Sequence, residues 1–103
     1  MKKLTIEEAE RMMKKKNGNL ALFGSDIEEL PDNLNVNGNL DLFCSKIKKL
    51  PKNLTVNGSL DIEYTKITKL PDNLTVKGDL YCKKDVIIPE SVKIEGGIKR
   101  HEE

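Results

Sequence analysis

A 20-residue unit repeats along the chain, and this period restricts the possible folds more than any other feature of the sequence. The dipeptide Leu-Pro recurs at positions 30, 50 and 70. Residues 30–49 are identical to residues 50–69 at 12 of 20 positions, and residues 50–69 to 70–89 at 9 of 20. Periods of roughly 20 to 50 residues are typical of proteins that stack similar units into one continuous core. The chain is therefore predicted to form a single domain over residues 1–103.

The polarity pattern inside each unit predicts strands. Leu34, Val36, Leu40 and Leu42 alternate with polar residues, and a period of two indicates a strand with one buried side. Gly38 interrupts the pattern, which indicates a kink or a close approach of two backbones.

Stacking equivalent strands about 4.8 Å apart gives a parallel sheet. We predict a β-rich repeat fold, a right-handed parallel β-solenoid of about four rungs over residues 17–98. Three inward columns would form its core: Leu20, Leu40, Leu60 and Leu80; Leu22, Leu42, Ile62 and Cys82; Ile27, Ile47, Ile67 and Ile87.

The segment Leu40-x-Leu42-x-x-Ser45-x-Ile47 resembles the L-x-L-x-x-N-x-L segment of leucine-rich repeats. The Leu-Pro-x-x-Leu opening is similar to the 20-residue bacterial subtype found in secreted effectors, although no counterpart of their ligase domain is present. The resemblance implies a curved horseshoe whose exposed sheet binds proteins. Two departures from this family are present. The usual Asn is replaced by Ser25, Ser45, Thr65 and Asp85, which can still hydrogen-bond a turn backbone but less fully. The added Val-x-Gly lengthens the strand run and keeps a straighter, three-sided solenoid open.

Residues 5–16 are predicted to form the only helix. Thr5 followed by Glu8 has the spacing of a capping box, and Asn17-Gly18 ends the helical pattern. We expect the helix to cap the first rung, with partner binding or a membrane surface as the alternative role. Residues 99–103 are expected to be a flexible, charged tail.

Composition excludes several classes of function. Eighteen Lys and Arg against 17 Asp and Glu give a net charge of +1, whereas general nucleic-acid binders carry a large positive excess. No apolar run approaches the roughly 20 residues that span a bilayer, so a cytoplasmic location is expected. His101, the single histidine, lies in the predicted tail, which argues against a catalytic triad. No enzyme activity, cofactor or metal site is predicted.

The two cysteines are predicted to be free thiols. Cys82 falls in an inward column, whereas Cys44 falls in a turn column with Gly24, Tyr64 and Lys84. The two positions are two rungs apart, beyond the roughly 7 Å Cα separation that a disulfide tolerates.

Two surfaces are candidates for partner binding. The first is the outward side of the predicted sheet, where Phe23 and Phe43 are expected to stack and Asp41 to lie beside Asp61; its candidate residues are Phe23, Asp41, Phe43, Asp61, Glu63, Tyr81 and Lys83. The second is a lysine-rich side formed by Lys46, Lys48, Lys49, Lys66 and Lys69.

A non-enzymatic protein-interaction module is the function that these patterns favour, as a monomer or a small homo-oligomer. Short proteins with similar repeats occur in phages and mobile elements, and this resemblance implies an inhibitor of a host defence protein such as the Cas9 nuclease. Two alternatives remain: a structural protein that assembles with itself, and nucleic-acid binding through the lysine-rich side.

Overall fold

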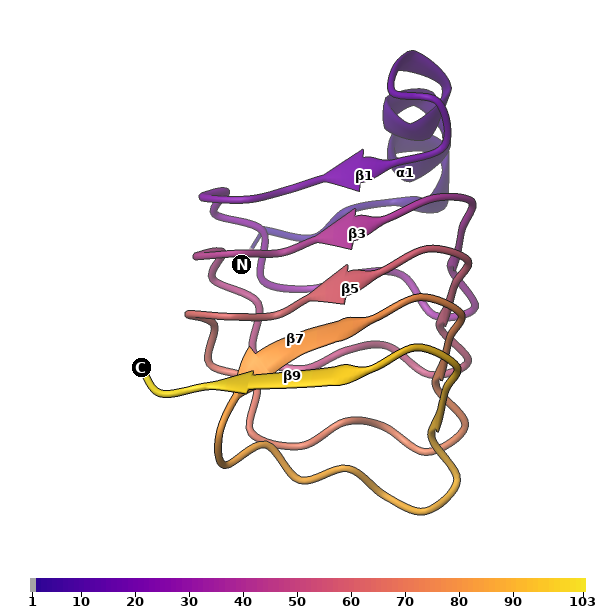
Figure 1. The fold of residues 1–103 in the computed structure, drawn as a ribbon. Helices are drawn as coiled ribbons and strands as arrows, with labels where there is room; N and C mark the ends of the chain where they lie inside the picture. Colours follow the sequence, from indigo (N-terminus) through magenta and orange to yellow (C-terminus); the bar gives the residue numbers. More distant parts are fainter. Residues whose placement is uncertain (1) are drawn as a thin grey trace.

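The computed structural model describes residues 2–103 as a stack of rungs preceded by one helix, as Figure 1 shows. The helix α1 spans Ile6–Lys15. The strands are β1 (Leu20–Ala21), β2 (Asn35–Val36), β3 (Leu40–Asp41), β4 (Thr55–Val56), β5 (Leu60–Asp61), β6 (Thr75–Val76), β7 (Leu80–Lys83), β8 (Lys93–Ile94) and β9 (Ile98–His101).

The strands form two parallel sheets that make two sides of the solenoid. One sheet has the order β1-β3-β5-β7-β9, and the other has the order β2-β4-β6-β8. A third side carries isolated parallel bridges, from Lys3 to Glu29 and from Lys69 to Ile87. The predicted parallel β-solenoid with an N-terminal helix is thus confirmed, in its three-sided form.

Gly38 divides the alternating segment into strands of two different sheets. Val36 ends β2 and Leu40 begins β3, so the chain turns a corner between them. At this corner the N–H of Gly38 donates to the carbonyl oxygen of Gly18 at 2.7 Å. A Cβ on Gly38 would collide with the side-chain oxygen of Asn19 and would lie 3.1 Å from the backbone carbonyl carbon of Gly18. The glycine therefore serves both roles that the sequence left open, a bend and a close backbone approach.

The asparagine of each Leu-Pro-x-Asn-Leu opening lies at a second kind of turn. Asn33, Asn53 and Asn73 have φ values of 65°, 57° and 62°, in the left-handed region. Asparagine enters this region more readily than most residues, because its short polar side chain can bond the local backbone. The recurrence of asparagine at this position thus has a conformational cause.

Polar side chains connect successive rungs along one column. Asn19 Oδ1 accepts from the N–H of Asn39 at 2.7 Å, and Asn39 Oδ1 accepts from the N–H of Ser59 at 2.8 Å. Ser59 Oγ accepts from the N–H of Asp79 at 3.0 Å, and Asp79 Oδ1 from the N–H of Gly97 at 2.8 Å. Each side chain here satisfies a backbone group of the next rung, so this column stabilises the stack.

The predicted inward columns form the core, with one correction. Ile87 is 59% exposed, and Val86, which is 4% exposed, fills the buried position instead. The cause is the shortened fourth rung, in which Lys69 pairs with Ile87 only 18 residues later. This shift places Ile87 in the outward column of Lys69.

The helix caps the N-terminal end as predicted. Glu8 N–H donates to Thr5 Oγ1 at 3.1 Å, and Thr5 N–H donates to Glu8 Oε1 at 2.9 Å, which completes the capping box. Ala9 and Met13 of the helix are buried against the core. Ahead of the helix, Leu4 N–H donates to the carbonyl oxygen of Glu29 at 3.1 Å, so residues 2–4 add an unpredicted segment to the third side.

The C-terminal segment is a strand and not the flexible tail expected from residue 99 onward. Residues 98–101 form β9, which pairs in parallel with β7 from Leu80↔Ile98 to Lys83↔His101. Within residues 2–103, the structure has no helix with the length and apolar character needed to cross a bilayer.

Candidate protein-binding face

The outer side of the five-stranded sheet carries the first predicted surface. The register places Asp41 beside Asp61 and Asp61 beside Tyr81, as the 20-residue spacing predicts. We call this surface the sheet face. It comprises Phe23, Asp41, Phe43, Asp61, Glu63, Tyr64, Tyr81, Lys83 and His101. The structure thus gathers all seven predicted residues on one surface and adds Tyr64 and His101.

Aromatic side chains cover the first three rungs of the sheet face. Phe43 and Tyr64 meet edge to face, with ring centroids 5.4 Å apart and an interplanar angle of 67°. Among residues 2–103 this is the aromatic pair that forms, so the expected stack of Phe23 on Phe43 is wrong. Phe23 is 62% exposed and Tyr64 is 53% exposed. Large apolar surface at these positions is left in contact with solvent.

Tyr64 has an exposed ring and a left-handed backbone conformation, which glycine adopts more easily than other residues. Its φ is 57°, and the equivalent residues of the two preceding rungs, Gly24 and Cys44, have φ values of 67° and 59°. The left-handed conformation costs a residue with a Cβ roughly 1–2 kcal/mol. Gly24 is the residue in the sequence that indicates a left-handed turn at this position of the repeat. A tyrosine at the equivalent position 64 is therefore unexpected.

Two carboxylates of the sheet face are tied to the backbone of their own rungs. Asp41 Oδ1 accepts from the N–H of Phe43 at 3.1 Å, and Asp61 Oδ1 accepts from the N–H of Glu63 at 2.9 Å. Partial burial raises the pKa of Asp61 to about 6; the charges of Glu63 and Asp41 add to the rise, and the Glu63 N–H opposes it. The charge of Asp41, which the repeat spacing places beside Asp61, thus adds to a rise in pKa whose main cause is burial.

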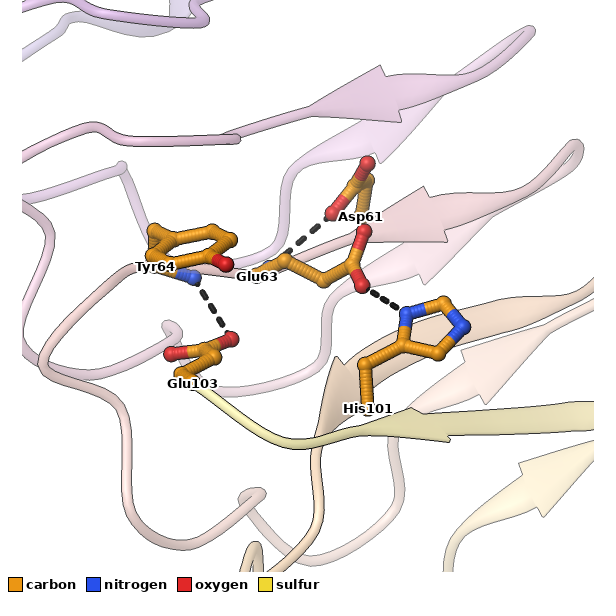
Figure 2. A network of polar contacts seen from close by, with 5 residues as sticks. All are labelled: Asp61, Glu63, Tyr64, His101 and Glu103. Atoms are coloured by element: carbon orange, nitrogen blue, oxygen red, sulfur yellow. Dashed lines mark hydrogen bonds and ion pairs between the residues drawn. The ribbon is translucent and has the colours of Figure 1, made fainter.

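The C-terminal residues reach back across the third rung, as Figure 2 shows. His101 Nδ1 pairs with Glu63 Oε2, and Glu103 Oε2 accepts from the N–H of Tyr64 at 2.8 Å. These contacts fix the carboxylate of Glu63 and the backbone of Tyr64. Sequence analysis missed them because residues 99–103 carry no repeat signal.

The lysine-rich side lies on the third side of the solenoid, away from this network. Lys48 pairs with Glu28 at 3.7 Å. In the described part of the chain the other predicted lysines form no ion pair, and all are exposed: Lys46, Lys49, Lys66 and Lys69. The two predicted surfaces therefore remain separate and differ in character.

The two cysteines are free, as predicted. Cys44 is exposed in the turn between Phe43 and the third side, whereas Cys82 is buried in the core and burial raises the pKa of its thiol. Over residues 2–103, no three His, Cys, Asp or Glu side chains converge in a way that would hold a metal ion. A groove of about 760 Å³ between α1 and β2 is lined by other residues than those of the sheet face.

Comparison with protein families, with curated proteins and with solved structures finds no match for the chain.

Proposed function

We propose that the protein is a non-enzymatic interaction module that binds another protein through the sheet face. The observation that carries this proposal is Tyr64, a large aromatic residue that is more than half exposed in a backbone conformation favouring glycine. Backbone strain of this kind tends to concentrate where a ligand is bound. A tyrosine at such a site gives a partner a ring that is already held in place.

The neighbours of Tyr64 supply the rest of a binding patch. Phe43 packs against Tyr64, and Phe23 is exposed on the same side. Exposed aromatic rings are enriched at protein interfaces, where they supply most of the binding energy. Phe23, Phe43 and Tyr64 lie in the turns that follow β1, β3 and β5. Hydrogen bonds between successive rungs order these turns: the N–H of Gly24 donates to the carbonyl oxygen of Phe43 at 2.7 Å, and the N–H of Cys44 donates to that of Glu63 at 3.0 Å. Backbone that is already ordered in this way loses less conformational entropy when a partner covers it.

Charge gives the patch a preferred partner. Asp41, Asp61 and Glu63 lie close together beside the aromatic residues. Partial burial is the main cause of the raised pKa of Asp61, and the negative charges of Glu63 and Asp41 add to it. A partner that places a lysine or arginine here would relieve the repulsion and accelerate association. The partner we expect is therefore a protein with a basic surface and an apolar pocket.

The proposal is tested by comparing which proteins are captured by the wild-type protein and by two matched variants. Immobilised wild-type protein is exposed to a bacterial lysate and, separately, to purified Cas9, a candidate partner suggested by the resemblance to short repeat proteins of phages and mobile elements. The sheet-face variant is Phe43→Ala with Tyr64→Gly, and truncation of an interface anchor typically costs about 2 kcal/mol or more. We expect this variant to lose a protein that the wild type retains.

The control variant changes the lysine-rich side. Lys46→Glu with Lys66→Glu reverses two exposed charges that no described ion pair uses. We expect it to retain the partner, with nuclease treatment making no difference. Retention by the sheet-face variant and loss by the lysine variant would instead assign binding to the lysine-rich side, and sensitivity to nuclease would identify its ligand as nucleic acid.

A further inference from the structure

The two ends of the solenoid are covered to different extents. At the N-terminal end α1 buries the first rung, whereas β8 and β9 are the last strands of their sheets. Ile98 is 46% exposed, although its neighbour in the preceding rung, Leu80, is fully buried. Ile94 is likewise only partly buried beside the fully buried Val76. The last aliphatic residues of the core columns are therefore partly exposed to solvent at this end.

The backbone of β8 is arranged to accept another strand. Lys93 N–H donates to the carbonyl oxygen of Leu74 at 2.9 Å, and Glu95 N–H donates to that of Val76 at 2.9 Å. Because backbone groups alternate in direction along a strand, the N–H and the carbonyl of Ile94 point the opposite way, toward the open edge. Ile94, the last residue of β8, thus presents one donor and one acceptor to whatever lies beyond the last rung.

The side chains that flank Ile94 have opposite charges, so this segment is complementary to a second copy of itself in the antiparallel direction. Lys93 and Glu95 are both exposed and, being two residues apart, lie on the same outward side of the strand. In an antiparallel pair centred on residue 94, residue 93 of one strand lies opposite residue 95 of the other. Two copies of this strand would therefore oppose lysine to glutamate twice, and opposite charges across strands stabilise a pair.

We propose that this end binds a second copy of the same chain, through antiparallel pairing of the two β8 strands about a two-fold axis at Ile94. The two Ile94 residues exchange N–H to carbonyl hydrogen bonds across the axis. Lys93 of each copy lies opposite Glu95 of the other, and Val92, Ile94 and Ile98 of the two copies cover one another.

The contact closes at two copies. A two-fold contact uses the same edge of both copies and therefore leaves no free copy of that edge. The opposite end carries α1 and residues 2–4, which pair with Glu28 and Glu29, so the two ends differ. At the free end, Arg100 satisfies two backbone carbonyl oxygens, because its Nη1 donates to that of Lys84 at 2.8 Å and to that of Val86 at 3.0 Å. The sheet face stays exposed, since it lies on the outer side of the stack.

Charge reversal at β8 tests the pairing by sedimentation equilibrium of the 103-residue chain. Wild-type protein should show a monomer–dimer equilibrium. Lys93→Glu alone and Glu95→Lys alone each place like charges opposite one another twice, so each should weaken dimerisation at least about tenfold. The double variant Lys93→Glu with Glu95→Lys restores both opposed pairs and should recover the wild-type constant. Thr55→Lys, an outward position of the same column two rungs away, is the control and should behave as wild type.

Mixing the two single variants gives the decisive result. One then presents two glutamates at β8 and the other two lysines, so the mixture should form a heterodimer more readily than either variant forms a homodimer. A monomer at millimolar wild-type concentration, a dimer indifferent to the single reversals, or open-ended growth would each overturn the proposal. Circular dichroism of each variant separates these outcomes from loss of the fold.

Discussion

Single residues of the sheet face combine strain with exposure, and Tyr64 is the clearest case. Replacing Tyr64 with glycine removes a left-handed strain of roughly 1–2 kcal/mol. It also removes the edge-to-face contact with Phe43, which is worth about 0.5–1.5 kcal/mol, and it increases the flexibility of the unfolded chain.

These effects offset one another, so Tyr64→Gly should unfold within about 1 kcal/mol of the wild type in urea. The same variant should lose binding. A protein that is destabilised by several kcal/mol would show instead that Tyr64 is held by packing and has no need of a binding role.

Asp61 should make stability depend on pH. Its pKa is raised to about 6 in the folded protein, above the ordinary value of 3.8, so the folded state holds the proton more tightly than the unfolded state. Stability is therefore highest below about pH 4 for this group and is lost as the pH rises through about 6.

Asp61→Asn keeps the acceptor for the Glu63 N–H and removes the charge, so it should raise stability at pH 7. Because Asp61 is only partly buried, solvent screening limits the gain to about 1 kcal/mol or less. The measurement is the urea midpoint between pH 4 and 7 for the wild type and Asp61→Asn, with Asp41→Asn as the matched change one rung away. A pH profile that Asp61→Asn leaves unaltered would contradict the assignment.

At the scale of the elements, the short strands are stabilised by the columns of buried side chains that stack between successive rungs. Leu60 is fully buried between Leu40 and Leu80 in the central column. Leu60→Ala opens a cavity with rungs on both sides and should cost about 2–5 kcal/mol. Thr75→Ala, at a half-buried outward position, should cost little. Thermal unfolding of both variants checks the inward and outward assignment, which equal melting temperatures would refute.

The period of 20 residues was sufficient to predict which elements stack, because identical columns must meet in register. Gly38 itself predicted a bend or a close approach of two backbones. The alternation on both sides of it did not show that the bend separates strands of two different sheets, β2 and β3. The period also misplaced Ile87. The fourth rung is two residues shorter than the others, so Ile87 lies beside Lys69 on the outside, and Val86 takes the buried position in the core. The strand β9 was missed because its charged residues Lys99 and Arg100 hide an edge strand.

The candidate site was predictable to the same extent as the columns. Asp41, Asp61 and Glu63 were found because spacing alone sets their neighbours. His101 was missed because its contact with Glu63 spans two rungs and depends on β9. Tyr64 was assigned to a turn column, but its left-handed backbone follows from local geometry that the alternation pattern does not contain.

At the scale of the whole molecule, charge and aromatic side chains are distributed by side even though the net charge is only +1. The chain extends 32 × 26 × 20 Å, with aromatic and acidic residues on the sheet face and unpaired lysines on the third side. Composition predicted neither surface. The rung geometry did, because it converts residues 20 apart into neighbours.

Alkylation of Cys44 with and without a captured partner tests the central claim most directly. Cys44 is an exposed free thiol that directly follows Phe43 in the chain and occupies the turn position equivalent to Tyr64 one rung earlier. Cys82 is buried and serves as an internal reference for the intact fold. If a partner covers the sheet face, the alkylation rate of Cys44 should fall in proportion to the bound fraction, while Cys82 stays unreactive throughout. Binding that leaves the alkylation rate of Cys44 unchanged would place the partner elsewhere and contradict the account.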